Sequence, residues 1–79
     1  MDIRNITFDK AKDHLDDASS KFMNSSKSVK SSIFKSIKRL NRNIVILRRK
    51  NFKNIAKKEE YTKVIRMLIA WMKKYKRSL

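Results

Sequence analysis

Neither glycine nor proline occurs anywhere in this chain, and that absence restricts the fold more than any other feature. Backbone positions with positive φ normally use glycine, and tight β-hairpins depend on glycine or asparagine. A β-rich fold without glycine is therefore disfavoured, whereas asparagine can serve at helix ends. Glycine-rich phosphate-binding loops are excluded as well. The chain is predicted to be all-α, with three helices at about 9–23, 27–49 and 59–78.

The length of 79 residues allows a single small helical domain, residues 1–79, with a modest core. Chains of this size often add disulfides, a metal or a partner subunit. Cysteine is absent and His14 is the one histidine, which excludes disulfides, thiolate metal sites and His-rich sites. No cofactor is expected. We therefore expect self-association, as a homo-oligomer, to complete the bundle.

The first helix is predicted from apolar residues spaced three and four apart. Thr7 or Asp9 would cap it after an extended lead-in at residues 2–7. A turn is predicted at Asn24–Ser28, with Asn24 in the left-handed region. Two alternatives stay open: one continuous helix over residues 9–50, and a strand at Ile3–Phe8 followed by two helices. The stripe of the first helix is Phe8, Ala11, Leu15, Ala18 and Phe22.

The second helix carries an apolar stripe about 80° wide. Phe34 and Val45 lie on one flank of this stripe and Ile46 lies on the other. A lone surface helix would not need these flanking residues, so a third helix or a second subunit is expected to cover them. The stripe itself is Val29, Ile33, Ile37, Leu40, Ile44 and Leu47.

Asn51 would interrupt this stripe, so it is interpreted as a cap or connector. Phe52, Ile55 and Ala56 are expected in a short helical turn, before the last helix begins near Glu59. Acidic residues at its start and basic residues at its end would complement the helix dipole. Its stripe is Tyr61, Val64, Ile65, Leu68, Trp71, Met72, Tyr75 and Leu79.

The formal net charge of +15 is unevenly distributed. Residues 1–26 carry −1, residues 27–58 carry +12 and residues 59–79 carry +4. The middle segment contains twelve Lys or Arg and no Asp or Glu. Such charge repels itself in a compact chain, and a polyanion would relieve the repulsion. Nucleic acid and anionic membrane are the two candidate partners of this kind.

We favour a non-enzymatic function in which the basic side of the second helix contacts the phosphate backbone of nucleic acid, with DNA preferred over RNA. Lysine outnumbers arginine, which favours backbone contact over base reading, although Asn41 and Asn43 lie among the charges. The role would be coating, compaction or regulation. The predicted contact residues are Lys35, Lys38, Arg39, Arg42, Arg48, Arg49, Lys50, Lys53, Lys57 and Lys58.

Two other functions fit the composition. The last helix, with Trp71 on its apolar side, resembles in outline a basic amphipathic helix that binds a membrane surface, as in an antimicrobial protein. The whole chain could instead be an effector that inhibits a host protein by binding its acidic surface. In both of these functions, as in nucleic-acid binding, the protein is not an enzyme.

Catalytic and metal chemistry have few candidate residues. A hydrolytic set would have to combine His14 with Asp13 and a serine, and His14 lies off the apolar stripe, where solvent is expected. The four aspartates of the first helix could hold a divalent cation at i, i+4 spacing. The preferred interpretation is a solvated acidic face. These aspartates are Asp9, Asp13, Asp16 and Asp17.

The apolar runs at Ile44–Leu47 and Met67–Met72 are far shorter than the roughly 20 residues of a membrane span. Residues 1–8 lack the apolar run of a signal peptide. A cytoplasmic, nucleoid-associated or virion-associated location is expected. The heavy use of Lys, Asn, Ile and Ser suits an AT-rich genome, including those of viruses and mobile elements.

Overall fold

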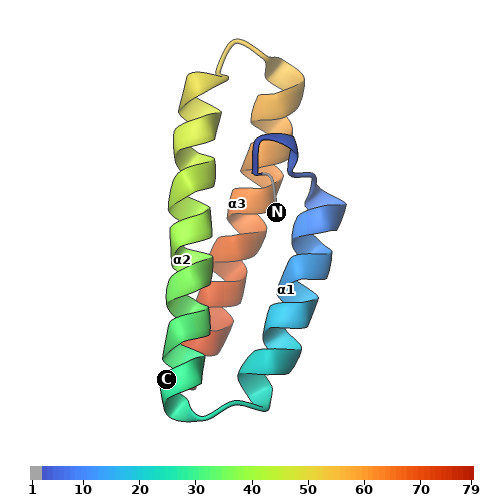
Figure 1. Cartoon of the computed structure of the whole chain (residues 1–79). Helices are drawn as coiled ribbons and strands as arrows, with labels where there is room; N and C mark the ends of the chain where they lie inside the picture. The colour runs from blue at the N-terminus through green and yellow to red at the C-terminus, as the bar shows by residue number, and fades with distance from the viewer. Residues whose placement is uncertain (1–2) are drawn as a thin grey trace.

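The computed structural model describes residues 3–79, and within them it contains helices and no strand. A 3-10 turn, η1 (Ile3–Asn5), precedes α1 (Phe8–Met23), α2 (Lys27–Lys50) and α3 (Ile55–Lys76). The three α-helices lie side by side along a molecule of 42 × 19 × 18 Å (Figure 1). The predicted all-α bundle of three helices is confirmed. Asp2, the first residue of the expected lead-in at 2–7, lies outside the described residues.

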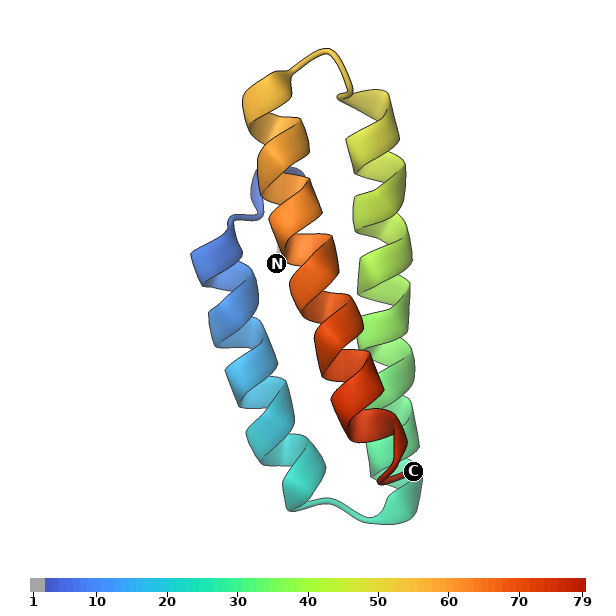
Figure 2. The same cartoon turned by 180° about the vertical axis from the view of Figure 1, so that it is seen from behind.

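Helices α2 and α3 form a long antiparallel hairpin, and the shorter α1 packs along it (Figure 2). The turn between α2 and α3 lies at one end of the long axis and the turn between α1 and α2 at the other. The bundle core forms within one chain. Self-association therefore stays a prediction.

The start of α1 is fixed both locally and by α3. The Thr7 hydroxyl oxygen accepts a hydrogen bond from the Lys10 backbone N–H at 3.2 Å, which confirms Thr7 as the N-cap. The Phe8 backbone N–H donates to the carboxylate of Glu60, which belongs to α3. A carboxylate at a helix N-terminus also interacts favourably with the helix dipole. Glu60 thus holds α1 against α3, a role that the sequence did not suggest.

The chain breaks between α1 and α2, so the alternative of one helix over residues 9–50 is wrong. Asn24 has φ −101° and ψ 10°, not the left-handed conformation that we expected. The left-handed region is not needed, because side chains satisfy the last carbonyls of α1. The Asn24 amide donates to the Ser20 carbonyl oxygen at 3.0 Å, and the Ser25 hydroxyl donates to that of Lys21.

Helix α3 begins at Ile55, four residues before the predicted start at Glu59. The reason is Asn54, whose side-chain oxygen accepts from the Lys57 backbone N–H at 3.2 Å and caps the helix. The separate helical turn predicted over 52–56 therefore does not exist. Phe52 lies in the turn, and Lys57 and Lys58 occupy the first turn of α3. The end at Lys76 is two residues short of the prediction, and Leu79 is exposed.

The N-terminal lead-in contributes to the core, and the alternative strand at Ile3–Phe8 is wrong. Residues 3–5 form the 3-10 turn, and Ile6 is buried at 3% exposure. The hydroxyl of Tyr61 in α3 donates to the Arg4 backbone oxygen at 2.9 Å. This contact attaches the lead-in to α3 and explains how Ile6 reaches the core.

Phe22 is the aromatic centre of the core and is fully buried. Its ring centroid lies 5.8 Å from that of Trp71 and 5.1 Å from that of Tyr75, both in edge-to-face geometry. Buried Trp71 donates its indole N–H to the Ser19 hydroxyl at 2.8 Å, so its polar group is satisfied. The buried residues are Ile6, Ala11, Leu15, Ala18, Phe22, Ile37, Ile44, Tyr61, Val64, Leu68 and Trp71.

The predicted apolar stripe of α2 faces the core except at its first residue, since Ile33, Leu40 and Leu47 pack against the buried core residues. Ile37 and Ile44 are buried as expected, but Val29 is 47% exposed. Phe34 packs on Trp71 of α3, with ring centroids 6.3 Å apart, so a third helix covers this flank of α2. Ile46, on the opposite side, stays exposed. Two polar residues of α2 also lie on its packed side: Asn41 has a buried side-chain oxygen, and Arg48 bonds to α3.

The buried Asn41 side-chain oxygen has no hydrogen-bond partner among the described residues. An unsatisfied buried acceptor costs about 1–3 kcal/mol. Asn41→Leu is therefore expected to raise the free energy of unfolding by about 1–2 kcal/mol, measured by urea denaturation followed by circular dichroism. The exposed Asn43→Leu on the same helix is the control and should change stability by only a few tenths of a kcal/mol. Equal stabilisation by both variants would show that the orphaned oxygen carries no cost.

Candidate nucleic-acid interface

Six of the ten predicted contact residues lie exposed on α2, and we call them the basic stripe. From Lys35 to Arg49 the stripe follows the helix axis for about 21 Å, at a rise of about 1.5 Å per residue. The exposed side chain of Ile46 interrupts it between Arg42 and Arg49. The basic stripe consists of Lys35, Lys38, Arg39, Arg42, Arg49 and Lys50.

The described residues place no carboxylate in an ion pair with any of the six side chains of the basic stripe. The four aspartates of α1 are exposed, and Asp17 pairs with Lys21 of the same helix at 3.1 Å. The aspartates of α1 are thus not paired with the basic stripe, which is available to an external anion.

Arg48 does not belong to this surface. Its side chain is partly buried, and its Nε–H donates to the Thr62 hydroxyl of α3 at 2.8 Å. Thr62 in turn donates to the Lys58 backbone oxygen at 2.8 Å. Arg48 therefore links α2 to α3. Arg48 was predicted as a contact residue because it is positively charged. The helical pattern did not show that it lies on the side of α2 that faces α3.

Lys53, Lys57 and Lys58 lie at the turn between α2 and α3, beyond the end of the basic stripe. Lys53 is in the turn itself, with its ammonium nitrogen 5.9 Å from the centroid of the Phe52 ring. Lys57 and Lys58 are in the first turn of α3, near the positive end of its dipole. These three lysines extend the positive charge to the tip of the hairpin.

Helix α3 adds basic residues that sequence reasoning did not include in the interface. Lys73 and Lys76 line a surface hollow together with Lys38 of the basic stripe, and Phe34 and Met72 are also in its lining. No residue of α1 lines this hollow. The connection of four residues makes α2 and α3 antiparallel neighbours, whereas the predicted helix bounds had left nine residues between them. Basic residues at the same level along the two helices, such as Lys38 of α2 and Lys73 of α3, can then lie on one face of the molecule.

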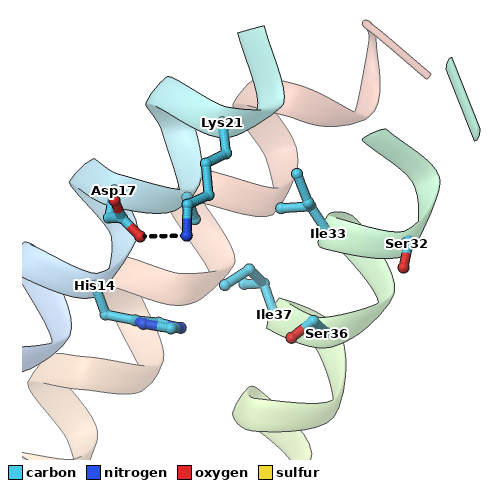
Figure 3. A pocket seen from close by; sticks show the side chains of 8 residues that line it. His14, Asp17, Lys21, Ser32, Ile33, Ser36 and Ile37 are labelled. Carbon is cyan, nitrogen blue, oxygen red and sulfur yellow. Dashed lines mark ion pairs between the residues drawn. The ribbon is translucent and has the colours of Figure 1, made fainter. Parts of the chain in front are cut away.

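A second hollow separates α1 from α2 (Figure 3). His14 and the Asp17–Lys21 ion pair lie on one wall, and Ser36 and Ile37 lie on the other. Within residues 3–79, no hydrogen bond joins His14 to an aspartate or a serine, and no three His, Asp or Glu side chains converge as metal ligands. His14 is exposed, as predicted.

Trp71, on which the membrane-surface alternative depended, is in the core at 7% exposure. Its contacts with Phe22, Phe34 and Ser19 would have to break before the indole could enter a bilayer. Among the described helices, none combines the length and the apolar character that a membrane crossing requires.

Comparison with known proteins adds no relative: no protein-family model, no curated protein and no solved structure matches this chain.

Proposed function

We propose that this protein binds nucleic acid without catalysing a reaction, by laying the basic stripe of α2 along phosphate groups. The observation that carries the proposal is that the six Lys and Arg side chains of the basic stripe are exposed on one helix. Among the described residues, none of the six has a carboxylate partner. Each Lys or Arg side chain that contacts a phosphate displaces condensed counterions, which gives affinity without sequence preference. The preferred partner is DNA.

The dimensions of α2 suit a duplex. An α-helix with side chains is about 10–12 Å in diameter, and the major groove of B-DNA is about 12 Å wide. With α2 along the groove, Lys38, Lys73 and Lys76 would extend the contact to a flanking phosphate row from the hollow that they share. Fifteen lysines against seven arginines favour charge neutralisation over bidentate reading of bases.

Self-association on the nucleic acid would multiply these weak contacts. The protein would then coat or compact DNA, and it would be found with that DNA in a nucleoid or a virion. The exposed aspartates of α1 offer complementary charges to the basic stripe of a neighbouring copy.

The test is a salt series of binding to a fluorescent 20-bp duplex, followed by anisotropy. If the six basic side chains of the stripe each contact a phosphate, a plot of log Kd against log salt should have a slope of about 5. Affinity should then fall about a thousandfold between roughly 50 and 200 mM salt. A slope near zero, or no binding at low salt, would contradict the proposal.

Vesicles containing phosphatidylserine are the parallel probe, with Trp71 emission as the signal. Because Trp71 is buried against Phe22, its emission should not shift on adding vesicles. A blue shift together with weak duplex binding would instead favour the membrane function.

A further inference from the structure

The turn between α2 and α3 holds an aromatic side chain in solvent. Phe52 is 60% exposed and Ile55, which follows at the start of α3, is 70% exposed. The turn around Phe52 is well bonded. The Asn51 side-chain amide donates to the Leu47 oxygen at 2.9 Å, and the Asn54 N–H donates to the Asn51 oxygen at 3.0 Å. The exposure of Phe52 is therefore a property of a defined turn.

Beside Phe52 lies an open hollow of about 350 Å³. Phe52 and Ile55 supply its apolar lining, and Lys58, Lys63 and Arg66 supply positive charge. Glu59 is the acidic residue in the lining. The hollow thus combines an aromatic face, three cations and one carboxylate acceptor at the tip of the hairpin.

This combination matches the chemistry of an unpaired nucleotide. A base has an apolar face that stacks on an aromatic ring, and the phosphates on either side need cations. The carboxylate of Glu59 can accept from the exocyclic amino group of a base, as carboxylates do with cytosine. The Lys53 ammonium lies over the Phe52 ring, 5.9 Å from its centroid. A base that stacks on that face of the ring would displace the ammonium, which could then pair with the phosphate beside the base.

We propose that the hairpin tip binds an unpaired base of the nucleic acid that the basic stripe holds, with the base stacked on Phe52. This inference rests on the proposed function. Arg49 and Lys50 end the basic stripe directly before the turn, so a strand that follows the stripe reaches the tip. The preferred ligand is therefore a duplex with a single-stranded overhang.

The experiment measures anisotropy of three labelled probes at one salt concentration: a blunt 20-bp duplex, the same duplex with a five-nucleotide overhang, and the single strand. One stacked base contributes about 1–3 kcal/mol, so wild type should bind the overhang probe about 5- to 150-fold more tightly than the blunt duplex. Phe52→Ala should abolish this preference and leave blunt-duplex affinity unchanged. Phe52→Trp should keep it.

Met23→Ala is the matched control, because Met23 is 63% exposed and is the last residue of α1. Helix α1 ends at the opposite end of the molecule from the hairpin tip (Figure 1). It should keep the full preference for the overhang. An equal preference in Phe52→Ala and wild type, or an equal loss on all three probes, would overturn the inference. So would Phe52-dependent binding to phosphatidylserine vesicles without any overhang preference. If the protein binds the blunt duplex in a salt-dependent way but binds the overhang probe no more tightly, the stacking inference is wrong and the proposed function stands. If it binds none of the three probes, the proposed function is wrong too.

Discussion

Replacing Phe22 with alanine is expected to lower the free energy of unfolding by about 3–5 kcal/mol. Phe22 is fully buried, and its ring packs edge-to-face on Trp71 and Tyr75 of α3. The substitution removes both the buried apolar surface and the packing that holds α1 on the hairpin. A domain of this length has a total stability of about 4–12 kcal/mol, so the variant should be largely destabilised.

Thermal unfolding by circular dichroism measures this effect, and Tm should fall by more than about 12 °C. Phe52→Ala is the control with the same chemical change at an exposed site. It should alter stability by no more than about 0.5 kcal/mol. Similar Tm values for both variants would mean that Phe22 does not form the centre of the core.

Reversing the charge of Arg39, Arg42 and Arg49 together, by substitution with glutamate, is expected to weaken duplex binding at least about 100-fold. A charge pair at 4 Å contributes about 1 kcal/mol in water, and each reversal replaces attraction by repulsion. The slope of log Kd against log salt should also fall, by about 0.9 for each phosphate that the variant no longer neutralises. All three side chains are exposed, so the helix content should not change.

A matched pair of neutral variants separates position from net charge. Substituting glutamine for Arg39, Arg42 and Arg49 lowers the net charge from +15 to +12. The same substitution at three exposed lysines of α1 gives the same net charge, and these are Lys10, Lys12 and Lys21. Only the first variant should bind the duplex much more weakly. Equal weakening would mean that the whole charge of the protein, and not the basic stripe, attracts the duplex.

The helices were predictable where apolar spacing and capping residues agreed. Of the two predicted caps of α1, Thr7 and Asp9, the structure uses Thr7, and the turn before α2 begins at Asn24 as predicted. The start of α3 was predicted too late because Lys57 and Lys58 interrupt its apolar stripe. Asn54, which lies before both lysines, is the residue that caps the helix. A cap acts through one local hydrogen bond, and periodicity over several turns does not detect it.

The candidate site was predictable to the level of a helix face. Exposure of Lys35, Arg39 and Arg42 follows from their positions opposite the apolar stripe. Arg48 could not be separated from them, because a helical wheel does not say on which flank the next helix packs. The same limitation hid the buried side-chain oxygen of Asn41, whereas Phe34 was expected to be covered by a third helix or a second subunit and packs on Trp71 of α3.

By itself, the sequence determined the helical fold, the approximate helix ends and the placement of the charge on α2. These depend on local spacing, caps and the absence of glycine and proline. Only the tertiary structure decided that Arg48 bonds to Thr62 of α3 and that Glu60 anchors α1. It also decided that Lys38 shares a hollow with Lys73 and Lys76, and that Phe52 is exposed at the tip. The reason is that these features depend on the packing of helices against each other, and residues distant in sequence meet only through that packing.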